Sequence, residues 1–494
     1  MQKYPFFISK TRYLEALQCL KLLWYRFNRK NEIPSPTPEQ LEVMKQGTLV
    51  GKLAHNLFPE GITLKRDWNA ERMDKKSFAA LENRKPLFEP GFTFNQTYAI
   101  ADILSPQNDN RWDLIEVKSS TSVKAEHYPD LAFQKYVYTG RGLRINRCYL
   151  MHLNREYVRQ GALEPEQLFK KEDLTRKVDE YLPEVEKNLE EILKIISGEE
   201  PDVKISSHCN SPYACPLNKI CLRFLPEDHI LQLRGNKQFA YDLIEQGIYK
   251  MNDIPEGYDL TQKQLIQINS HKTKESYVDR EYLRAFLDEL AYPLYFLDFE
   301  TIAPAIPIYD STRPFEEIPF QFSLHVVESP TANPVHHAYL APGEVDPRSD
   351  VLCRLKELLG EKGSIVAYNA RYEQNCLSYS ARAYPEYTDW VEKVNQRFVD
   401  LLAPFKNLFY YHPSQNGSAS MKKVLPALTG SNYEHLDISN GSAARYEYMR
   451  ITFEKDITTK DRQQVRDWLE KYCEQDTRGM LEILQALRKE LNFS

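Results

Sequence analysis

Two acidic residues stand two positions apart in an apolar run of the C-terminal half, Asp298 and Glu300 in LYFLDFET. In a β-strand, alternate side chains share a face, so both carboxylates point one way and Phe299 the other. Like charges on an apolar strand are costly unless a cation holds them. Hard Mg²⁺ and Mn²⁺ prefer oxygen ligands, and two-metal phosphodiester hydrolysis needs several convergent carboxylates. The pair therefore indicates a metal site, with a solvated strand end as the alternative.

Further candidates follow along the chain. Asn369 and Glu373 stand near a strand-to-helix junction in SIVAYNARYEQNCL, and Asp400 ends the short apolar run of RFVDLLAPF. Tyr472 and Asp476 lie four apart in an expected helix and so share one face. Taken singly, each has a plainer explanation, such as a surface acid, an N-cap or a core tyrosine.

Together and in this order, these residues resemble the DEDD (RNase H-like) 3′→5′ exonucleases. The motifs are Asp298-Phe-Glu300, Asn369 to Glu373, and Tyr472-x₃-Asp476. The resemblance implies that the carboxylates hold two Mg²⁺ or Mn²⁺ ions, that Tyr472 orients the attacking water, and that Asn369 contacts substrate. The second motif ends in Glu373 where the family has Asp, so either Glu373 or Asp400 supplies the third ligand.

A second set of charged residues lies in the N-terminal part. TYAIADILSPQ (97–107) and RWDLIEVKSS (111–120) are predicted to form a hairpin, with Asp102 on the first strand. Glu116 and Lys118 share one face of the second strand. Carboxylates can bind a divalent metal, and a lysine can neutralise charge that grows on a phosphate. The alternative is a solvated strand edge.

Neighbouring residues complete a second resemblance. His55 lies on an expected helical stretch before the hairpin, and Gln134 and Tyr138 lie four apart on an expected helix after it. The order His, Asp, Glu-x-Lys, Gln-x₃-Tyr resembles the RecB-like branch of the PD-(D/E)XK nucleases. That resemblance implies that His55, Asp102 and Glu116 bind metal and that Lys118 assists catalysis. It also implies that Gln134 and Tyr138 contact substrate or support the site.

The cysteines are unevenly placed. Cys209, Cys215 and Cys221 follow the spacing C-x₅-C-x₅-C, and Cys19 stands far upstream. This arrangement resembles the iron–sulfur RecB-like nucleases of the AddB and CRISPR-adaptation exonuclease type, in which one cysteine precedes and three follow the nuclease core. The resemblance implies a [4Fe–4S] cluster that joins the two ends of the domain. A structural Zn²⁺ site and four unligated thiols are the alternatives.

The elements that must position these residues suggest a multidomain α/β chain. Helical spacing is expected at 8–27, 130–139 and 174–197, and strands are expected at 91–104, 112–118 and 146–153. Short polar helices follow, and from 291 strands alternate with helices. The predicted domains are a PD-(D/E)XK nuclease over 1–225, a helical connector over 226–290 and an RNase H-like DEDD domain over 291–494.

Composition sets the remaining expectations. The 494 residues suffice for two or three domains, and the net charge of −6 neither favours nor excludes nucleic-acid binding. No secretory signal or membrane-length apolar run is recognised, so a cytoplasmic protein without a membrane partner is expected. The sequence predicts a metal-dependent deoxyribonuclease, more an exonuclease than an endonuclease, that processes, repairs or defends DNA. A nucleic-acid-binding protein with one inactive domain and an RNA-processing exonuclease remain alternatives.

Overall fold

The computed structural model describes residues 7–491. Contacts between residues divide the chain into two compact units, one of residues 1–224 and 305–314 and the other of residues 225–304 and 315–494. Both units combine helices with mixed sheets, so the protein is a multidomain α/β protein. The helical segment expected as a connector is part of the second unit.

The first unit begins with strand β1 and ends with helix α8 before residues 305–314 join it. Its strands are β1 (Ile8–Ser9), β2 (Ile62–Thr63), β3 (Leu87–Phe88), β4 (Gly91–Phe94), β5 (Thr97–Ile100), β6 (Ile103–Pro106), β7 (Arg111–Lys118), β8 (Arg144–Leu153) and β9 (Phe169–Asp173). Its helices are α1 (Lys10–Gln18), α2 (Leu20–Asn28), α3 (Pro38–Ala54), α4 (Ala70–Ala80), α5 (His127–Gly140), α6 (Pro165–Leu168), α7 (Thr175–Ser197) and α8 (Asn218–Cys221).

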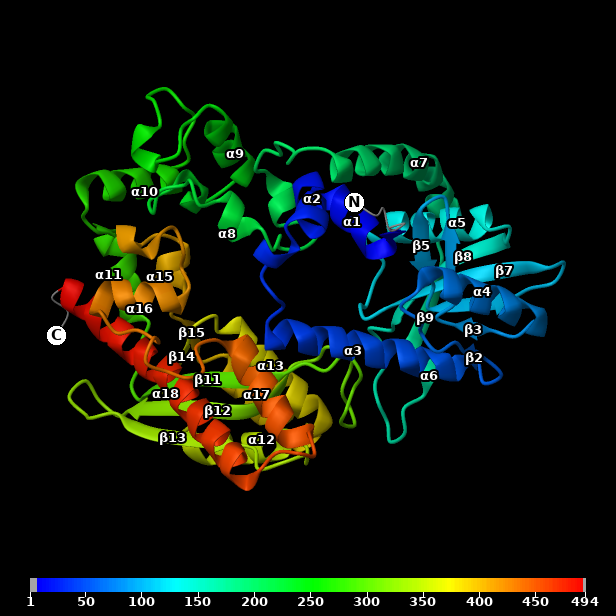
Figure 1. The fold of residues 1–494 in the computed structure, drawn as a ribbon. Helices are drawn as coiled ribbons and strands as arrows, with labels where there is room; N and C mark the ends of the chain where they lie inside the picture. The colour runs from blue at the N-terminus through cyan, green and yellow to red at the C-terminus, as the bar shows by residue number, and fades with distance from the viewer. Residues whose placement is uncertain (1–6, 492–494) are drawn as a thin grey trace. The chain divides into compact units, whose positions relative to one another are not determined.

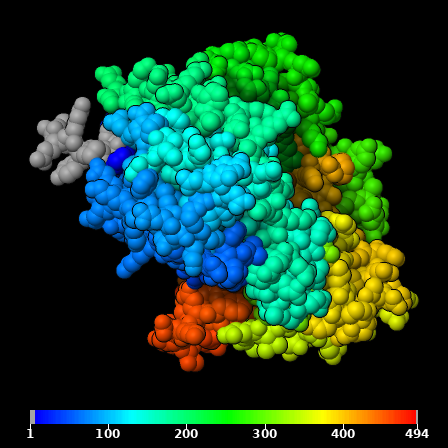
Figure 2. Space-filling view, turned by 90° about the vertical axis from the view of Figure 1, so that its right-hand side faces the viewer, coloured from blue at the N-terminus to red at the C-terminus, as the bar shows by residue number. Residues whose placement is uncertain are grey.

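A six-stranded sheet of order β2-β3-β6-β7-β8-β9 forms the centre of this unit. Strands β7 and β8 are parallel neighbours, and α5 connects them, as a crossover between parallel strands requires. Residues 112–116 of β7 are all buried, which is typical of a strand covered on both faces. Strands β1, β5 and β4 form a separate small sheet. The unit forms one continuous surface from blue to cyan-green in Figure 2.

Helix α7 packs against α5 and α2 and lies along the first unit (Figure 1). Its buried residues recur every three to seven positions, which places them on one face of the helix. They are Val178, Val185, Leu189, Ile192 and Ile196. The amphipathic pattern therefore dictates both the helix and the face that it buries.

The second unit carries the remaining elements. Its helices are α9 (Lys237–Glu245), α10 (Gln262–Thr273), α11 (Arg280–Asp288), α12 (Arg348–Leu358), α13 (Arg371–Ala383), α14 (Thr388–Asn395), α15 (Ala403–Lys406), α16 (Met421–Thr429), α17 (Gly441–Phe453) and α18 (Thr459–Glu490). Its strands are β10 (Tyr277–Val278), β11 (Leu294–Ile302), β12 (Ile318–Val327), β13 (Val335–Leu340), β14 (Ser364–Ala367), β15 (Phe398–Asp400) and β16 (Tyr410–Tyr411).

A five-stranded sheet of order β13-β12-β11-β14-β15 organises this unit. Strands β13, β12 and β11 are antiparallel, whereas β11, β14 and β15 are parallel. The long helix α18, red in Figure 1, packs along β11, β12 and β13. Its N-cap, Thr458, accepts a hydrogen bond from the backbone N–H of Asp461. Among the helices of residues 7–491, none combines the length and the apolar character that crossing a bilayer demands.

Candidate metal centres

Four buried or partly buried carboxylates face one cavity of about 430 Å³ in the second unit. Strand β11 supplies Asp298 and Glu300, helix α13 supplies Glu373, and α18 supplies Asp476. One carboxylate oxygen from each of Asp298, Glu300 and Asp476 lies within 4.8 Å of the other two. The sheet and two helices thus bring residues almost 180 positions apart into one acidic cluster. Phe299, which stands between the two carboxylates in the sequence, is buried.

The carboxylates of this cluster are like charges that are buried away from water. Burial raises the pKa of Asp298 well above its usual value, and the charges of Asp476 and Glu373 raise it further. Burial also raises the pKa of Glu373 to about 8 and that of Asp476 to about 6. The Oε2 atom of Glu373 is buried and has no hydrogen-bond partner. Such a set of oxygens fits one or two divalent cations, which would satisfy the unpaired atom and offset the repulsion.

Tyrosines and cations surround the carboxylates. Tyr433 donates a hydrogen bond of 2.7 Å to Oδ1 of Asp476. The ammonium of Lys422 lies 5.3 Å from the ring centroid of Tyr472, and it lines the cavity together with Arg445. Arg445 is held by the backbone oxygen of Thr301, 3.0 Å from its Nε. The cavity therefore offers positive charge next to the acidic cluster, as binding of an anionic substrate requires.

The loop between β14 and α13 positions the second predicted motif. Asn369 lines the cavity and adopts a left-handed backbone conformation with φ of 81°, which Asn tolerates better than most residues. Its backbone N–H donates to Oδ1 of Asp400 at 2.9 Å, and the N–H of Leu402 donates to the same oxygen at 3.0 Å. Asp400 is thus engaged with backbone amides, whereas Glu373 faces the cavity. Of the two alternatives for the third ligand, the geometry favours Glu373.

In the first unit, Glu116 lies within a buried network of ion pairs. Its Oε1 is 2.7 Å from Nζ of Lys118 and 2.6 Å from Nζ of Lys10, which α1 supplies. Lys118 also contacts Asp130 at 2.6 Å, and Gln134 donates to both Glu116 and Asp130 at 2.8 Å. Burial lowers the pKa of Lys118, but the charges of Asp130 and Glu116 outweigh it and leave the pKa well above its usual value.

Asp102 joins this network from a bend between β5 and β6, so the prediction that it lies on a strand is wrong. The observed hairpin pairs β6 with β7, and β5 belongs to the small sheet. The bend lets Oδ2 of Asp102 accept a hydrogen bond of 2.6 Å from the N–H of Val117. Burial and the charge of Glu116 raise the pKa of Asp102 to about 7. The two carboxylates are therefore close enough to interact strongly.

The other residues predicted for this site have different environments. His55 caps the C-terminal end of α3, and its ring stacks on Phe88 with the centroids 3.9 Å apart. Phe88 pairs with Ile103, next to Asp102 in the chain. Tyr138 is fully buried, and its hydroxyl accepts from the N–H of Ala101 at 2.9 Å and donates to the carbonyl of Pro90. This hydroxyl holds the backbone beside Asp102 and is shielded from any substrate.

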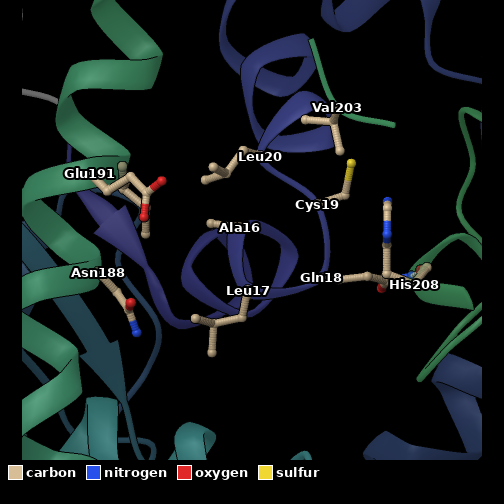
Figure 3. Close-up of a pocket in the computed structure, with 10 residues that line it drawn as sticks. Ala16, Leu17, Gln18, Cys19, Leu20, Asn188, Glu191, Val203 and His208 are labelled. Carbon is tan, nitrogen blue, oxygen red and sulfur yellow. Dashed lines mark hydrogen bonds between the residues drawn. The ribbon is translucent and has the colours of Figure 1, made fainter. Parts of the chain in front are cut away.

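The four clustered cysteines converge in the first unit. Cys19 is the extended residue between α1 and α2, a break that frees its side chain from both helices. In Figure 3 its sulfur points toward Val203, with His208 to the side. Burial raises the pKa of Cys209, Cys215 and Cys221, and Cys19 contributes to each increase. None of the four thiols is in a disulfide, so the set offers sulfur donors of the kind that metal sites use.

The cysteine segment also borders the charged site of this unit. A cavity of about 610 Å³ is lined by Lys10, Lys118 and Asp130 on one side and by residues 208 and 211–214 on another. Gln18 of α1 donates hydrogen bonds to the carbonyls of His208 and Tyr213, at 2.9 and 2.6 Å. The position of this wall therefore depends on how the cysteine segment is held.

Comparisons with known proteins cover part of the chain. Residues 295–420 match a family described as a domain of unknown function (DUF2779), a segment that includes Asp298, Glu300 and Glu373. The chain is similar to an uncharacterized protein of Mycoplasma pneumoniae, with 27% identity over 38% of this chain. An uncharacterized protein of Mycoplasma genitalium is 28% identical over the same share. The match covers 31% of the length of each relative, so the chain spans less than a third of these proteins.

Several site residues escape sequence reasoning. Asp130 stands four positions before Gln134, a spacing that could have placed both on the site-facing side of α5. Lys10 pairs with Glu116 across 106 positions, and no local pattern signals that contact. The same holds for Lys422, Tyr433 and Arg445, which reach the carboxylate cavity from segments that the sequence motifs do not include.

Proposed function

We propose that the chain is a metal-dependent deoxyribonuclease with two hydrolytic sites, acting on single-stranded DNA or DNA ends, more as an exonuclease than as an endonuclease. The second unit would be an RNase H-like DEDD domain, and the first would be a PD-(D/E)XK domain. The carboxylate cluster of Asp298, Glu300 and Asp476 carries this proposal. DNA end processing, repair or defence would suit two sites on one chain.

The residues of the second unit fit a pair of Mg²⁺ or Mn²⁺ ions. Asp298, Glu300, Glu373 and Asp476 would hold them, and the partnerless oxygen of Glu373 supports this assignment. When bound, such ions polarise the phosphoryl group and lower the pKa of a coordinated water. Tyr433 fixes one oxygen of Asp476, and such hydrogen bonds to a ligand orient it.

Side chains around the cavity would position the substrate. Lys422 and Arg445 offer cationic groups to the phosphate that is being cut. Burial raises the pKa of Tyr472 far above its usual value, so this phenol keeps its proton and can donate to the attacking water or to a phosphate oxygen. Asn369 would contact the nucleotide from its left-handed turn at the cavity wall.

In the first unit, Asp102 and Glu116 would hold a divalent ion, with His55 as a further ligand, and Lys118 would stabilise the charged phosphate. Gln134 orients Glu116 by hydrogen bonding. The cavity that Lys118 lines is large enough for part of a nucleic-acid strand, about 610 Å³. Tyr138 supports the backbone beside Asp102.

Cys19, Cys209, Cys215 and Cys221 would hold a [4Fe–4S] cluster, with Zn²⁺ as the alternative. A link between Cys19 and Cys209 closes a loop of ~190 residues, worth about 5 kcal/mol if it acts as a disulfide of that length does. Iron and zinc analysis of anaerobically purified protein tests this assignment. Cys215→Ser should lose the bound metal, and Cys353→Ser, which changes an exposed cysteine, should retain it.

Degradation of 5′- and 3′-end-labelled single-stranded DNA with Mn²⁺ tests the two hydrolytic sites. Asp298→Asn should abolish one product ladder and Lys118→Met the other. Two matched variants change exposed residues of the same kinds, Glu470→Gln on α18 and Lys124→Met near β7. These controls should degrade DNA as the wild type does. Intact DNA with every variant and with the wild type contradicts the proposal, and degradation of RNA alone contradicts the choice of DNA.

One observation favours a second candidate for the first unit. Two lysines already neutralise Glu116 and Asp130 there, which leaves Glu116 less available to a metal than the carboxylates of the second unit. The first unit would then bind nucleic acid without cutting it. In that case Asp298→Asn abolishes all degradation but retains affinity for DNA, and Lys118→Met leaves degradation unchanged.

A further inference from the structure

Two histidines and a glutamate of the second unit form a cluster that differs in its chemistry from the carboxylate cavity. His325 on β12 and His336 on β13 stand directly opposite each other in the antiparallel register. Opposite residues share a face of the sheet, and the two rings stack with their centroids 4.5 Å apart. Ser323 shares that face with His325, because it lies two positions before it on the same strand. Helix α18 packs on these strands and adds Glu474 and Thr477.

A chain of hydrogen bonds fixes the tautomers of both imidazoles. The hydroxyl of Thr477 donates to the carbonyl of Glu474 at 3.1 Å, so its oxygen must accept from Ser323 at 2.6 Å and from Nδ1 of His325 at 2.8 Å. Because the proton of Ser323 is used in that bond, its oxygen must accept from Nε2 of His336, 2.9 Å away. The lone pairs therefore remain on Nε2 of His325 and on Nδ1 of His336.

Each imidazole thus donates one N–H to a protein acceptor and keeps a lone pair on its other nitrogen. A ligating histidine uses one nitrogen for the metal and donates the other N–H to a fixed acceptor, which sets the ring orientation. Here the acceptors are the hydroxyls of Thr477 and Ser323. Glu474 can supply a third ligand, because Arg478 donates to its Oε1 and leaves Oε2 available.

The distances suit a small divalent ion of borderline softness. One ligand atom each from His325, His336 and Glu474 lies within 4.8 Å of the other two. Bonds of about 2.0–2.1 Å at tetrahedral angles bring such atoms to about 3.3 Å. Binding of an ion therefore requires the exposed His336 ring to turn out of its stack on His325 and the partly exposed Glu474 side chain to move toward it. Two imidazoles and one carboxylate match Zn²⁺ better than Mg²⁺, which prefers oxygen ligands throughout.

We propose that His325, His336 and Glu474 form a Zn²⁺ site that joins β12 and β13 to α18. Glu474 and His336 are accessible enough for water to complete the coordination. The site lies on the helix that also carries Tyr472 and Asp476, so bound Zn²⁺ restrains the element that positions part of the carboxylate cluster. This inference rests on its own residues and does not require the nuclease proposal.

The full-length protein, first stripped of metal with a chelator, is equilibrated with Zn²⁺ in buffer that contains millimolar Mg²⁺ to occupy oxygen-only sites. Bound Zn²⁺ is then counted by elemental analysis, and its affinity is measured by competition with a chromophoric chelator. His336→Ala and Glu474→Gln should each bind one equivalent less than the wild type, or bind it about 100-fold or more weakly. His337→Ala is the matched control, because the next residue of β13 faces the other side of the sheet.

The control should retain the wild-type stoichiometry, which also accounts for any zinc held by the cysteines. Equal stoichiometry and affinity in all four proteins overturn the proposal. Loss in His336→Ala with full retention in Glu474→Gln overturns the three-ligand site. Both substituted side chains are at least partly exposed, so melting in the presence of chelator should match the wild type and exclude misfolding as the cause.

Discussion

The Glu373→Gln variant should be less stable than the wild type at pH 5 but more stable than the wild type at pH 8. Burial raises the pKa of this carboxyl from its usual 4.5 to about 8. Because the pKa is higher in the folded than in the unfolded state, the folded state loses stability as pH rises from 4.5 through 8. At 1.36 kcal/mol per pKa unit, the loss is about 1 kcal/mol at pH 5 and about 4 kcal/mol at pH 8.

Glutamine removes this loss but introduces a cost of its own. Its amide occupies a position where Oε2 of Glu373 has no partner, and a buried unpaired N–H costs about 1–3 kcal/mol. The variant should therefore be less stable than the wild type by about 1 kcal/mol at pH 5 and more stable by about 2 kcal/mol at pH 8. For a domain of this size, these values correspond to a Tm about 2–4 °C lower and about 4–8 °C higher.

Differential scanning calorimetry in chelator at the two pH values measures the effect. Glu470→Gln on α18, an exposed carboxyl on the same unit, should leave Tm unchanged at both. Added Mn²⁺ should stabilise the wild type more than Glu373→Gln, because the variant lacks a ligand. A Tm difference of the same sign and size at pH 5 and pH 8 refutes the reasoning about burial.

Three further substitutions test single contacts. Lys10→Met removes a charge that lowers the pKa of Asp102, so the Lys118-dependent activity should begin at a pH higher by about 1 unit, and an unshifted profile contradicts this. Tyr138→Phe removes two buried hydrogen bonds of the hydroxyl, worth about 0.5–1.5 kcal/mol each in urea unfolding, while the N–H of Ala101 keeps its bond of 3.2 Å to the carbonyl of Pro90, and the KM for DNA should not change. Tyr433→Phe frees one oxygen of a ligand and should weaken Mn²⁺ binding about 10–100-fold in titration calorimetry; equal affinity would show that Tyr433 does not orient Asp476.

Strong periodicity made some elements predictable. The helix expected at 174–197 spans Thr175–Ser197, and the apolar run with Asp298 and Glu300 is the central strand β11. Buried stripes and continuous apolar strands follow directly from the side chains, so local sequence determines them. The gathering of Asp298, Glu300, Glu373 and Asp476 around one cavity agrees with the motif order.

Sheet membership and long-range pairing were not predictable in this way. The run at 91–104 contains three short strands that serve two sheets, and Asp102 lies at a bend between two of them. Which sheet a short strand joins depends on partners distant in the chain. For the same reason, the ion pair between Lys10 and Glu116 leaves no trace in local spacing.

In the first unit, an early segment of the chain contacts a late one, and this affects the order in which the unit can fold during synthesis. Residues of α1 and the residue after it meet residues 208–221, whereas the sheet between them is encoded in the intervening stretch. A chain emerging from the ribosome can therefore pair β6, β7 and β8 early, but the wall of the Lys118 cavity cannot form until residues 211–214 have left the exit tunnel. The second unit follows residue 224 in the chain, so this wall can close while the second unit is still being synthesised.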